Sequence, residues 1–227
     1  MRRDSGGMSD ASKSRMPRIA LFVAALIAGA SYWPASHLAF PPDLMLAWKG
    51  AGVALLSIWA GLAARERNGW LIAAVMGFGA LGDVLIELNQ IAGAAAFLVG
   101  HVLAIILYLT NRRRENPSVA IAIAVIVPVL AYAITRSPII LAYAIGLGGM
   151  AGSAWASRFP RSFVALGALL FAASDLLIFA RLGPLAHSIV PNLLIWPLYL
   201  AGQALIAWGV VRTLEARKRN EDLHHRL

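Results

Sequence analysis

The sequence has no cysteine and is poor in charged residues. The lack of cysteine excludes disulfides, thiolate nucleophiles and cysteine-ligated metal sites. Charged residues make up 14% of the 227 residues and hydrophobic residues 59%, whereas a soluble domain is typically about a quarter charged and about 45–50% apolar. The shortage of charge excludes an ordinary soluble domain, and the apolar surplus predicts an integral membrane protein.

The apolar residues are grouped in eight runs. Each run is close to the roughly 20 residues that a helix needs to cross a hydrocarbon core of about 30 Å. The runs predict spans at residues 17–36, 43–63, 69–88, 91–110, 117–135, 137–156, 161–181 and 190–212. We therefore expect an all-α fold, a polytopic membrane bundle of eight transmembrane helices.

The basic residues are distributed unevenly between the two sides of this bundle. The formal net charge is +9, and 17 of the 20 Lys and Arg residues lie in the two tails and in the connections on the same side. Only Arg136 and Arg181 lie on the other side, and Lys49 lies inside a span. By the positive-inside rule, both termini are expected to be cytoplasmic, in a bacterial inner membrane. The charge would then face membrane lipids and not nucleic acid.

The two ends of the chain are polar. We expect a disordered basic tail at residues 1–16, a membrane domain at 17–212 and a polar basic tail at 213–227 that extends the last helix. The first apolar run, which reaches A-G-A at residues 28–30, also resembles a secretory signal peptide with a cleavage site. We favour an uncleaved span, because the run continues to Tyr32 and Trp33, which suit a membrane interface.

Three short strings recur in the same order in the two halves of the membrane domain, at offsets of 92 to 102 residues. The pairs are G-D-V-L-I (82–86) with S-D-L-L-I (174–178), F-L-V-G-H-V-L (97–103) with Y-L-A-G-Q-A-L (199–205), and L-A-W-K (46–49) with L-A-Y-A (141–144). They predict a 4+4 internal repeat with halves at about 17–112 and 117–212. Because each unit has an even number of spans, the two copies would be parallel.

Polar side chains from five different spans fall in the same half of the membrane. Counted from the non-cytoplasmic end of each span, Lys49, Asp83 and Asp175 are roughly 7–9 Å deep, and His101 and Gln203 about 15–18 Å deep. A charge at bilayer depth costs about 2.5–3.5 kcal/mol on insertion scales, so such groups are expected to face a cavity or one another. Taken singly, Lys49 could instead snorkel to the surface, and each other group could be a satisfied interior residue.

The ordered motifs resemble the YhhN family of eight-span membrane proteins, the lysoplasmalogenases. The resemblance runs from about residue 17 to 212 and depends on G-D-V-L, G-H, S-D-L-L and Y-L-A-G-Q in spans three, four, seven and eight. The family commonly has Lys-Pro in span two, whereas this chain has Lys49-Gly50. The replacement of proline by Gly50 affects the local helix geometry, whereas the positive charge of Lys49 is retained.

The resemblance implies hydrolysis of the vinyl ether bond of lysoplasmalogens, giving a fatty aldehyde and a glycerophospho-choline or -ethanolamine. A lysophospholipid, or a related ether or enol lipid, is then the expected partner. The family's essential aspartates carry over to Asp83 and Asp175, its lysine to Lys49, and its other polar positions to residues of spans four and eight, namely His101, Tyr199 and Gln203. Glu87, one turn beyond Asp83 on the same helix face, is expected at the mouth of the site.

Vinyl ether hydrolysis fits a pair of carboxyl groups in different protonation states. Protonation of the β-carbon creates an oxocarbenium ion that water captures, so one acid must keep its proton and one carboxylate must assist. Burial favours the protonated form of an unpaired acid, and a neighbouring ammonium favours ionisation. We therefore predict that Lys49 keeps Asp83 ionised and that Asp175 is the acid, since Lys49 has only Ala144 as its repeat counterpart. The reverse assignment also fits the sequence. Neither metal nor cofactor is required.

Two other functions are compatible with the same polar cluster. A lipid or small-solute transporter would also use an internal repeat, midplane polar groups and mid-span prolines such as Pro128 and Pro197. A zinc-dependent membrane hydrolase is the weaker alternative, because His101 is the one histidine deep in a span and zinc sites usually recruit more imidazoles or thiolates.

Overall fold

The computed structural model describes residues 7–224 and confirms an all-α bundle with eight helices long and apolar enough to cross a membrane. Within these residues no β-strand is present; the one β-bridge, between Arg112 and Ser157, is isolated. The helices are α1 (Gly7–Ala35), α2 (Pro42–Ala63), α3 (Arg67–Leu88), α4 (Gln90–Thr110), α5 (Ser118–Thr135), α6 (Pro138–Ala156), α7 (Leu166–Arg181), entered through the π-helical turn η1 (Arg161–Ala165), and α8 (Val190–His224).

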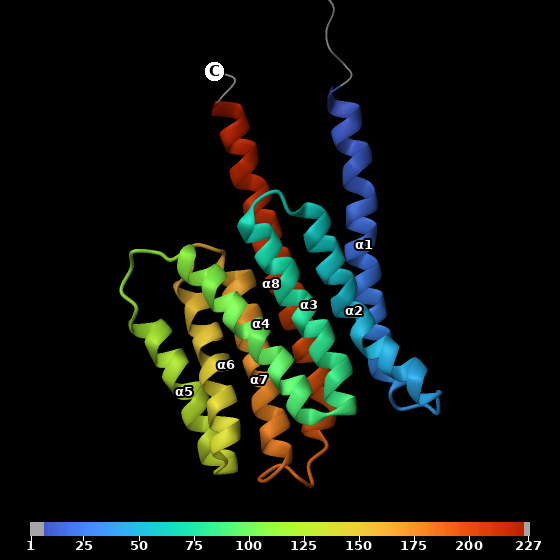
Figure 1. Ribbon diagram of the computed structural model, residues 1–227, viewed down its shortest axis with the longest axis vertical. Coiled ribbons are helices and arrows are strands. Elements are labelled where there is room, and N and C mark those ends of the chain that lie inside the picture. The colour runs from blue at the N-terminus through green and yellow to red at the C-terminus, as the bar shows by residue number, and fades with distance from the viewer. Residues whose placement is uncertain (1–6, 225–227) are drawn as a thin grey trace, which may run out of the picture.

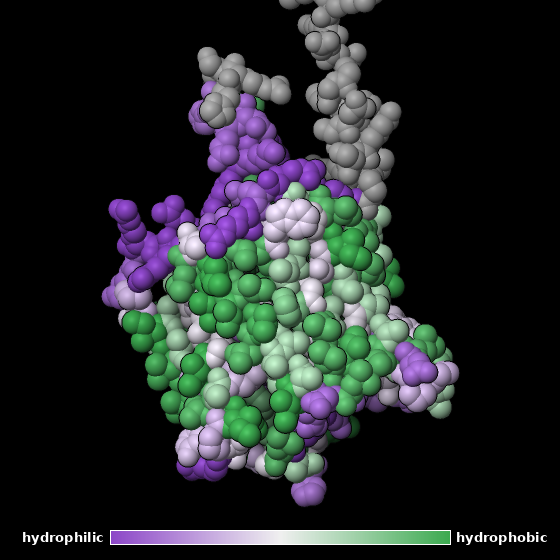
Figure 2. Space-filling model, in the orientation of Figure 1, coloured by the Kyte–Doolittle hydropathy of each residue, from purple (hydrophilic) through white to green (hydrophobic). Residues whose placement is uncertain are grey.

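The start of α1 and the end of α8 lie at the same end of the bundle, as an even number of spans requires (Figure 1). Figure 2 shows an apolar surface over the middle of the visible face of the bundle and polar side chains gathered at the end that carries the two termini. The chain is therefore a multi-pass integral membrane protein. Placing the end with the termini in the cytoplasm remains a prediction from the charge distribution.

The first and last helices are longer than their spans. α1 begins at Gly7, so it includes ten residues that we predicted as part of a disordered tail; residues 1–6 of that tail lie outside the described residues. α8 has 35 residues and so measures roughly 50 Å, against a hydrocarbon core of about 30 Å. Its final turns therefore project from the membrane, where Arg18 of α1 forms an ion pair with Glu215.

Short, capped connections hold the helices as hairpins. A single residue, Asn89, joins α3 to α4, and its side-chain Oδ1 accepts a 3.0 Å hydrogen bond from the N–H of Ala92, which satisfies one of the free donors at a helix start. Between α5 and α6, Arg136 adopts the left-handed conformation with φ of 54°, and Ser137 caps the next helix. The α3–α4 hairpin places Asp83 and His101 on neighbouring helices.

The helices do not pack in two identical sets of four. In the first half, α2 packs along α3, and α3 packs along α4. In the second half, α6 and α7, the counterparts of α2 and α3, have few contacts with each other. Instead, α6 packs on α5 and α4. α8 contacts α1, α2, α3 and α7. It approaches α7 most closely where Gly202 faces Gly167, since a Cβ on either glycine would lie 2.7 Å from the other's carbonyl oxygen. The internal repeat therefore remains a prediction.

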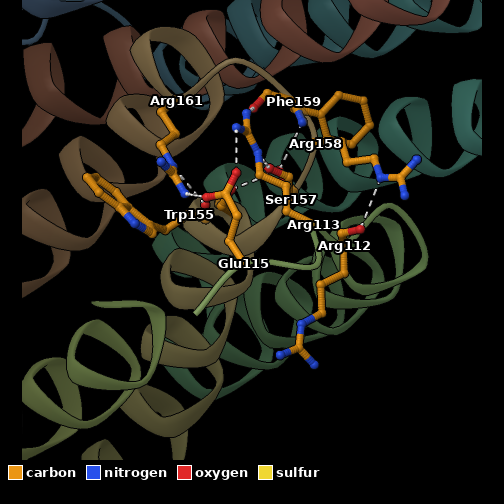
Figure 3. A network of polar contacts seen from close by, with 9 residues as sticks. Arg112, Arg113, Glu115, Trp155, Ser157, Arg158, Phe159 and Arg161 are labelled. Carbon is orange, nitrogen blue, oxygen red and sulfur yellow. Dashed lines mark hydrogen bonds and ion pairs between the residues drawn. The ribbon is translucent and has the colours of Figure 1, made fainter. Parts of the chain in front are cut away.

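A network of arginines ties together the α4–α5 and α6–α7 connections (Figure 3). Arg113 donates from Nε to the carbonyl oxygen of Ser157 at 2.6 Å and from Nη2 to that of Phe159 at 3.2 Å. Glu115 pairs with Arg161 at 2.7 Å and with Arg113 at 3.5 Å. These contacts, with the hydrogen bond from Arg161 as the largest cause, lower the pKa of Glu115. The network fixes the α5–α6 hairpin against η1 at the end of the bundle that carries the termini.

Candidate functional site

Asp83 lies inside the bundle in a chain of hydrogen bonds between α3 and α8. It is 3% exposed, and its Oδ2 accepts a 2.8 Å hydrogen bond from the hydroxyl of Tyr199. That hydroxyl in turn accepts a 3.2 Å hydrogen bond from the side-chain amide of Gln203, one turn further along α8. Both α8 residues are buried. The donors point in one direction along the chain, toward Asp83.

Asp175 on α7 has a separate phenol partner. It is 7% exposed, and its Oδ2 accepts a 2.7 Å hydrogen bond from the hydroxyl of Tyr143 on α6. Tyr143 is not among the site residues predicted from the sequence, although it belongs to the L-A-Y-A string of the predicted repeat. The available signal was its position immediately before Ala144, the repeat counterpart of Lys49.

Lys49, two turns inside the start of α2, forms an ion pair with Glu87 in the last turn of α3. The Lys49 side chain is 16% exposed and that of Glu87 52% exposed, so the pair spans the boundary between the interior and the surface. The helix continues unbroken through Lys49-Gly50, where the family commonly has proline. Gly50 is buried, and a Cβ there would lie 2.8 Å from a methyl group of Val84 on α3.

An aromatic cluster lies between the two carboxyl groups. The ring of Phe171 lies 5.3 Å from those of Tyr199 and His101, and the ring of Tyr143 lies 5.4 Å from that of His101 on its other side. Phe97 contacts both Phe171 and Tyr199, with ring centroids 6.1 and 6.0 Å apart. The ring of His101 therefore contacts Tyr143, the partner of Asp175, directly, and Phe171 lies between His101 and Tyr199, the partner of Asp83.

The cluster brings together side chains from six helices. The residues predicted from the sequence come from α2, α3, α4, α7 and α8, and Tyr143 adds α6. Asp83, Tyr199 and Gln203 are joined by hydrogen bonds, whereas both ring nitrogens of His101 lack a hydrogen-bond partner within residues 18–224. Across the described part of the chain, no three His, Asp or Glu side chains are grouped closely enough to hold a metal ion.

The arrangement is suited to proton transfer within the membrane. Two neighbouring carboxylates repel each other, which favours a state in which one is ionised and the other keeps its proton. Each accepts a hydrogen bond from a phenol on a different helix. These features define a polytopic membrane protein with a buried pair of aspartates.

The chain belongs to the YhhN family, whose sequence model matches residues 44–210. The match covers α2 to α7 and the membrane-spanning part of α8, and so includes every residue of the cluster. Comparison with curated proteins and with solved structures gave no match.

Proposed function

We propose that this protein hydrolyses the vinyl ether bond of lysoplasmalogen-like lipids and releases a fatty aldehyde and a glycerophospho-choline or -ethanolamine. The observation that carries the proposal is the pair of buried aspartates, each of which accepts a hydrogen bond from its own phenol. Membership of the YhhN family supports it. A membrane location also suits a substrate with a long alkenyl chain.

In the proposed reaction Asp175 is the general acid and Asp83 the carboxylate. The carboxyl proton of Asp175 is transferred to the β-carbon of the vinyl ether, and the electron pair of the double bond forms the new C–H bond. The adjacent carbon becomes an oxocarbenium ion. Water adds to this carbon and gives its proton to Asp83, and the hemiacetal then collapses to an aldehyde while the glycerol oxygen takes up a proton. The hemiacetal hydroxyl supplies the proton that the glycerol oxygen takes up. Transfer of the proton gained by Asp83 to Asp175, through solvent, then restores both carboxyl groups and closes the cycle.

The neighbouring residues have distinct roles in this scheme. Lys49 favours the ionised form of Asp83, and its partner Glu87 lies at the exposed end, near the expected position of the lipid headgroup. Tyr199 and Gln203 orient Asp83, and Tyr143 orients Asp175. Because the site is built from side chains that converge from several helices, small changes in helix packing would alter its geometry.

The deciding experiment is incubation of the purified protein with a 1-alkenyl lysophospholipid, with release of the fatty aldehyde as the measurement. The matched 1-alkyl lipid is the control, because its saturated ether has no β-carbon that can be protonated. We expect aldehyde from the alkenyl lipid alone. No aldehyde from any vinyl ether lipid would overturn the proposal.

A transporter is the second candidate, and the prolines inside α5 and α8, Pro128 and Pro197, are the observation that favours it. Proline inside a membrane helix removes a backbone hydrogen bond and permits bending during alternating access. Reconstitution in liposomes would show substrate-dependent movement of the solute without formation of product.

A reporter fused to each end of the chain would test the proposed cytoplasmic location of the termini in a bacterial inner membrane.

A further inference from the structure

Five arginine side chains gather at the end of the bundle that carries the termini, where the α4–α5 and α6–α7 connections meet α8. They are Arg112, Arg113, Arg158, Arg161 and Arg217. Glu115 forms ion pairs with two of them, Arg113 and Arg161. Within residues 18–224, the other three arginines form no ion pair with a carboxylate, so the chain leaves their charge without a partner there.

Uncharged groups hold these three arginines close to Asn111. Nε of Arg158 donates to the carbonyl oxygen of Arg112 at 3.1 Å, and Nη1 of Arg217 donates to Oδ1 of Asn111 at 2.9 Å. The backbone N–H of Arg158 also donates to the carbonyl oxygen of Asn111 at 2.7 Å, and the guanidinium of Arg217 lies 5.5 Å from the ring centroid of Phe159. Like charges repel each other, so the fold holds together positive charges that an anion from outside the chain would neutralise.

Arg112 and Arg158 offer N–H donors to such an anion. A guanidinium carries five N–H donors; within residues 18–224, that of Arg158 uses one, at Nε, and that of Arg112 uses none. Both residues are exposed, and Figure 3 shows that their guanidinium groups extend away from Glu115. The planar fork of arginine matches the paired oxygens of a phosphate group, so a phosphate is the ligand chemistry that fits this surface.

An exposed apolar stripe on α4 leads to the same place. Its residues follow one another at helical spacings of three and four positions and are 36–50% exposed, namely Val99, Val102, Ile106 and Leu109. At the helical rise the stripe is about 15 Å long, about half the thickness of a hydrocarbon core. Arg112 follows at its end, where its N–H donates to the carbonyl oxygen of Leu109 at 3.2 Å. A ligand with a phosphate and a hydrocarbon chain would contact both surfaces, whereas a free phosphate would leave the stripe uncovered.

We infer that Arg112, Arg158 and Arg217 form a binding site for one anionic phospholipid of the surrounding membrane, with its phosphate at the guanidinium groups and an acyl chain on the α4 stripe. A zwitterionic lipid binds less well, because these arginines repel its ammonium group. The site lies at the opposite end of the bundle from Asp83 and Asp175, so the bound lipid is not the substrate of the proposed reaction. The inference therefore goes beyond the proposed function and does not depend on it.

Thermal unfolding of the full-length protein in a neutral detergent tests the site. Phosphatidylglycerol is expected to raise the Tm in a saturable manner, and phosphatidylcholine with the same acyl chains to raise it much less. The double variant Arg112→Gln/Arg158→Gln should bind phosphatidylglycerol about tenfold more weakly or worse, because it loses charge-assisted hydrogen bonds. Arg65→Gln/Arg67→Gln is the matched control, since it removes the same charge from exposed residues where α2 joins α3, and it should bind like the wild type.

Three results would overturn the inference. Equal weakening in both double variants would show attraction to the general positive charge of this end and not a site. An equal rise in Tm with phosphatidylcholine would remove the role of the anionic charge, and an equal rise with inorganic phosphate at the same concentration would remove the role of the acyl chain. Native mass spectrometry gives an independent measurement, in which the wild type should retain one phosphatidylglycerol that Arg112→Gln/Arg158→Gln loses; no selective retention by the wild type would also contradict the site.

Discussion

The hydroxyl of Tyr199 on α8 donates a 2.8 Å hydrogen bond to Oδ2 of Asp83 on α3, 116 residues earlier in the chain. A hydrogen bond to a charged group contributes about 1.5–3 kcal/mol. We expect Tyr199→Phe to lower kcat/KM for a vinyl ether lysolipid by roughly 10- to 100-fold with the fold intact, measured as initial rates of aldehyde release. Trp33→Phe, a change of similar kind in a side chain near the surface, is the control, and an equal loss in both variants would argue against a specific role for Tyr199.

Replacement of either aspartate by asparagine is expected to remove aldehyde release while the protein remains monodisperse. In the proposed reaction, Asp175→Asn removes the proton donor and Asp83→Asn removes the proton acceptor, and loss of general acid–base catalysis typically costs a factor of about 10²–10⁴. Carbon protonation as the slow step further predicts that the wild-type protein forms aldehyde more slowly in heavy water. Full activity of either variant would contradict the two-carboxylate mechanism.

Lys49→Met is expected to lower kcat/KM by about tenfold, equivalent to about 1.4 kcal/mol, because in the proposed reaction the ammonium group of Lys49 favours the ionised form of Asp83. Lys49→Arg keeps the positive charge and should retain more activity. Glu87→Gln is the matched control, since it breaks the same ion pair at a side chain that is 52% exposed. A larger loss in Glu87→Gln than in Lys49→Met would show that the ion pair, and not the charge near Asp83, is what matters.

Gly82→Ala is expected to destabilise the protein by about 1–3 kcal/mol, the usual cost of overpacking, and to reduce activity. A Cβ on Gly82 would lie 2.8–2.9 Å from three ring carbons of Phe97, and Phe97 contacts Tyr199. Gly61→Ala is the control, because its Cβ would lie at ordinary contact distances of 3.8 and 3.9 Å from Trp70 and Ala73. Thermal unfolding in detergent should show a lower Tm for Gly82→Ala alone.

Glu115→Gln is expected to lower the Tm slightly at neutral pH and to have no effect in acid. Arg161 and Arg113 hold the pKa of Glu115 below its ordinary value, so its ion pairs stabilise the fold above the pKa of the unfolded chain. This contribution is lost as the pH falls through the lowered pKa of the folded state. Thermal unfolding of both proteins as a function of pH should show two curves that converge on acidification. Curves that stay parallel would contradict the assignment.

The membrane helices could be predicted from the sequence because the length of an apolar run sets the length of a span. The predicted 91–110 and 161–181 differ by no more than one residue from the helical stretches in the structure. Other features depend on packing. The π-helical turn η1 and the helix over residues 7–16 were not predicted, because neither leaves a distinct signature in hydropathy.

The residues of the candidate site could largely be predicted from the sequence, but which of them form hydrogen bonds with one another could not. Asp83, Asp175 and Lys49 stand out because charge is costly in apolar surroundings, whereas Tyr143 resembles any aromatic residue of a span. That Tyr143 bonds to Asp175 while Tyr199 bonds to Asp83 depends on which helices are neighbours. A sequence with three short repeated strings does not specify those neighbours, and the roles of these residues in catalysis remain predictions.

The hydrogen bond between Asp83 and Tyr199 joins a residue of the first four helices to one of the last four. His101, also in the first four helices, faces Tyr143 and Phe171 in the last four. Neither half of the chain therefore contains a finished site. If the chain were cut in the connection from Asn111 to Pro117, it would give two four-helix fragments. Each fragment alone would lack function, and function would return only when the two associate in the membrane. If the halves did arise from one ancestral unit, that unit needed a partner copy.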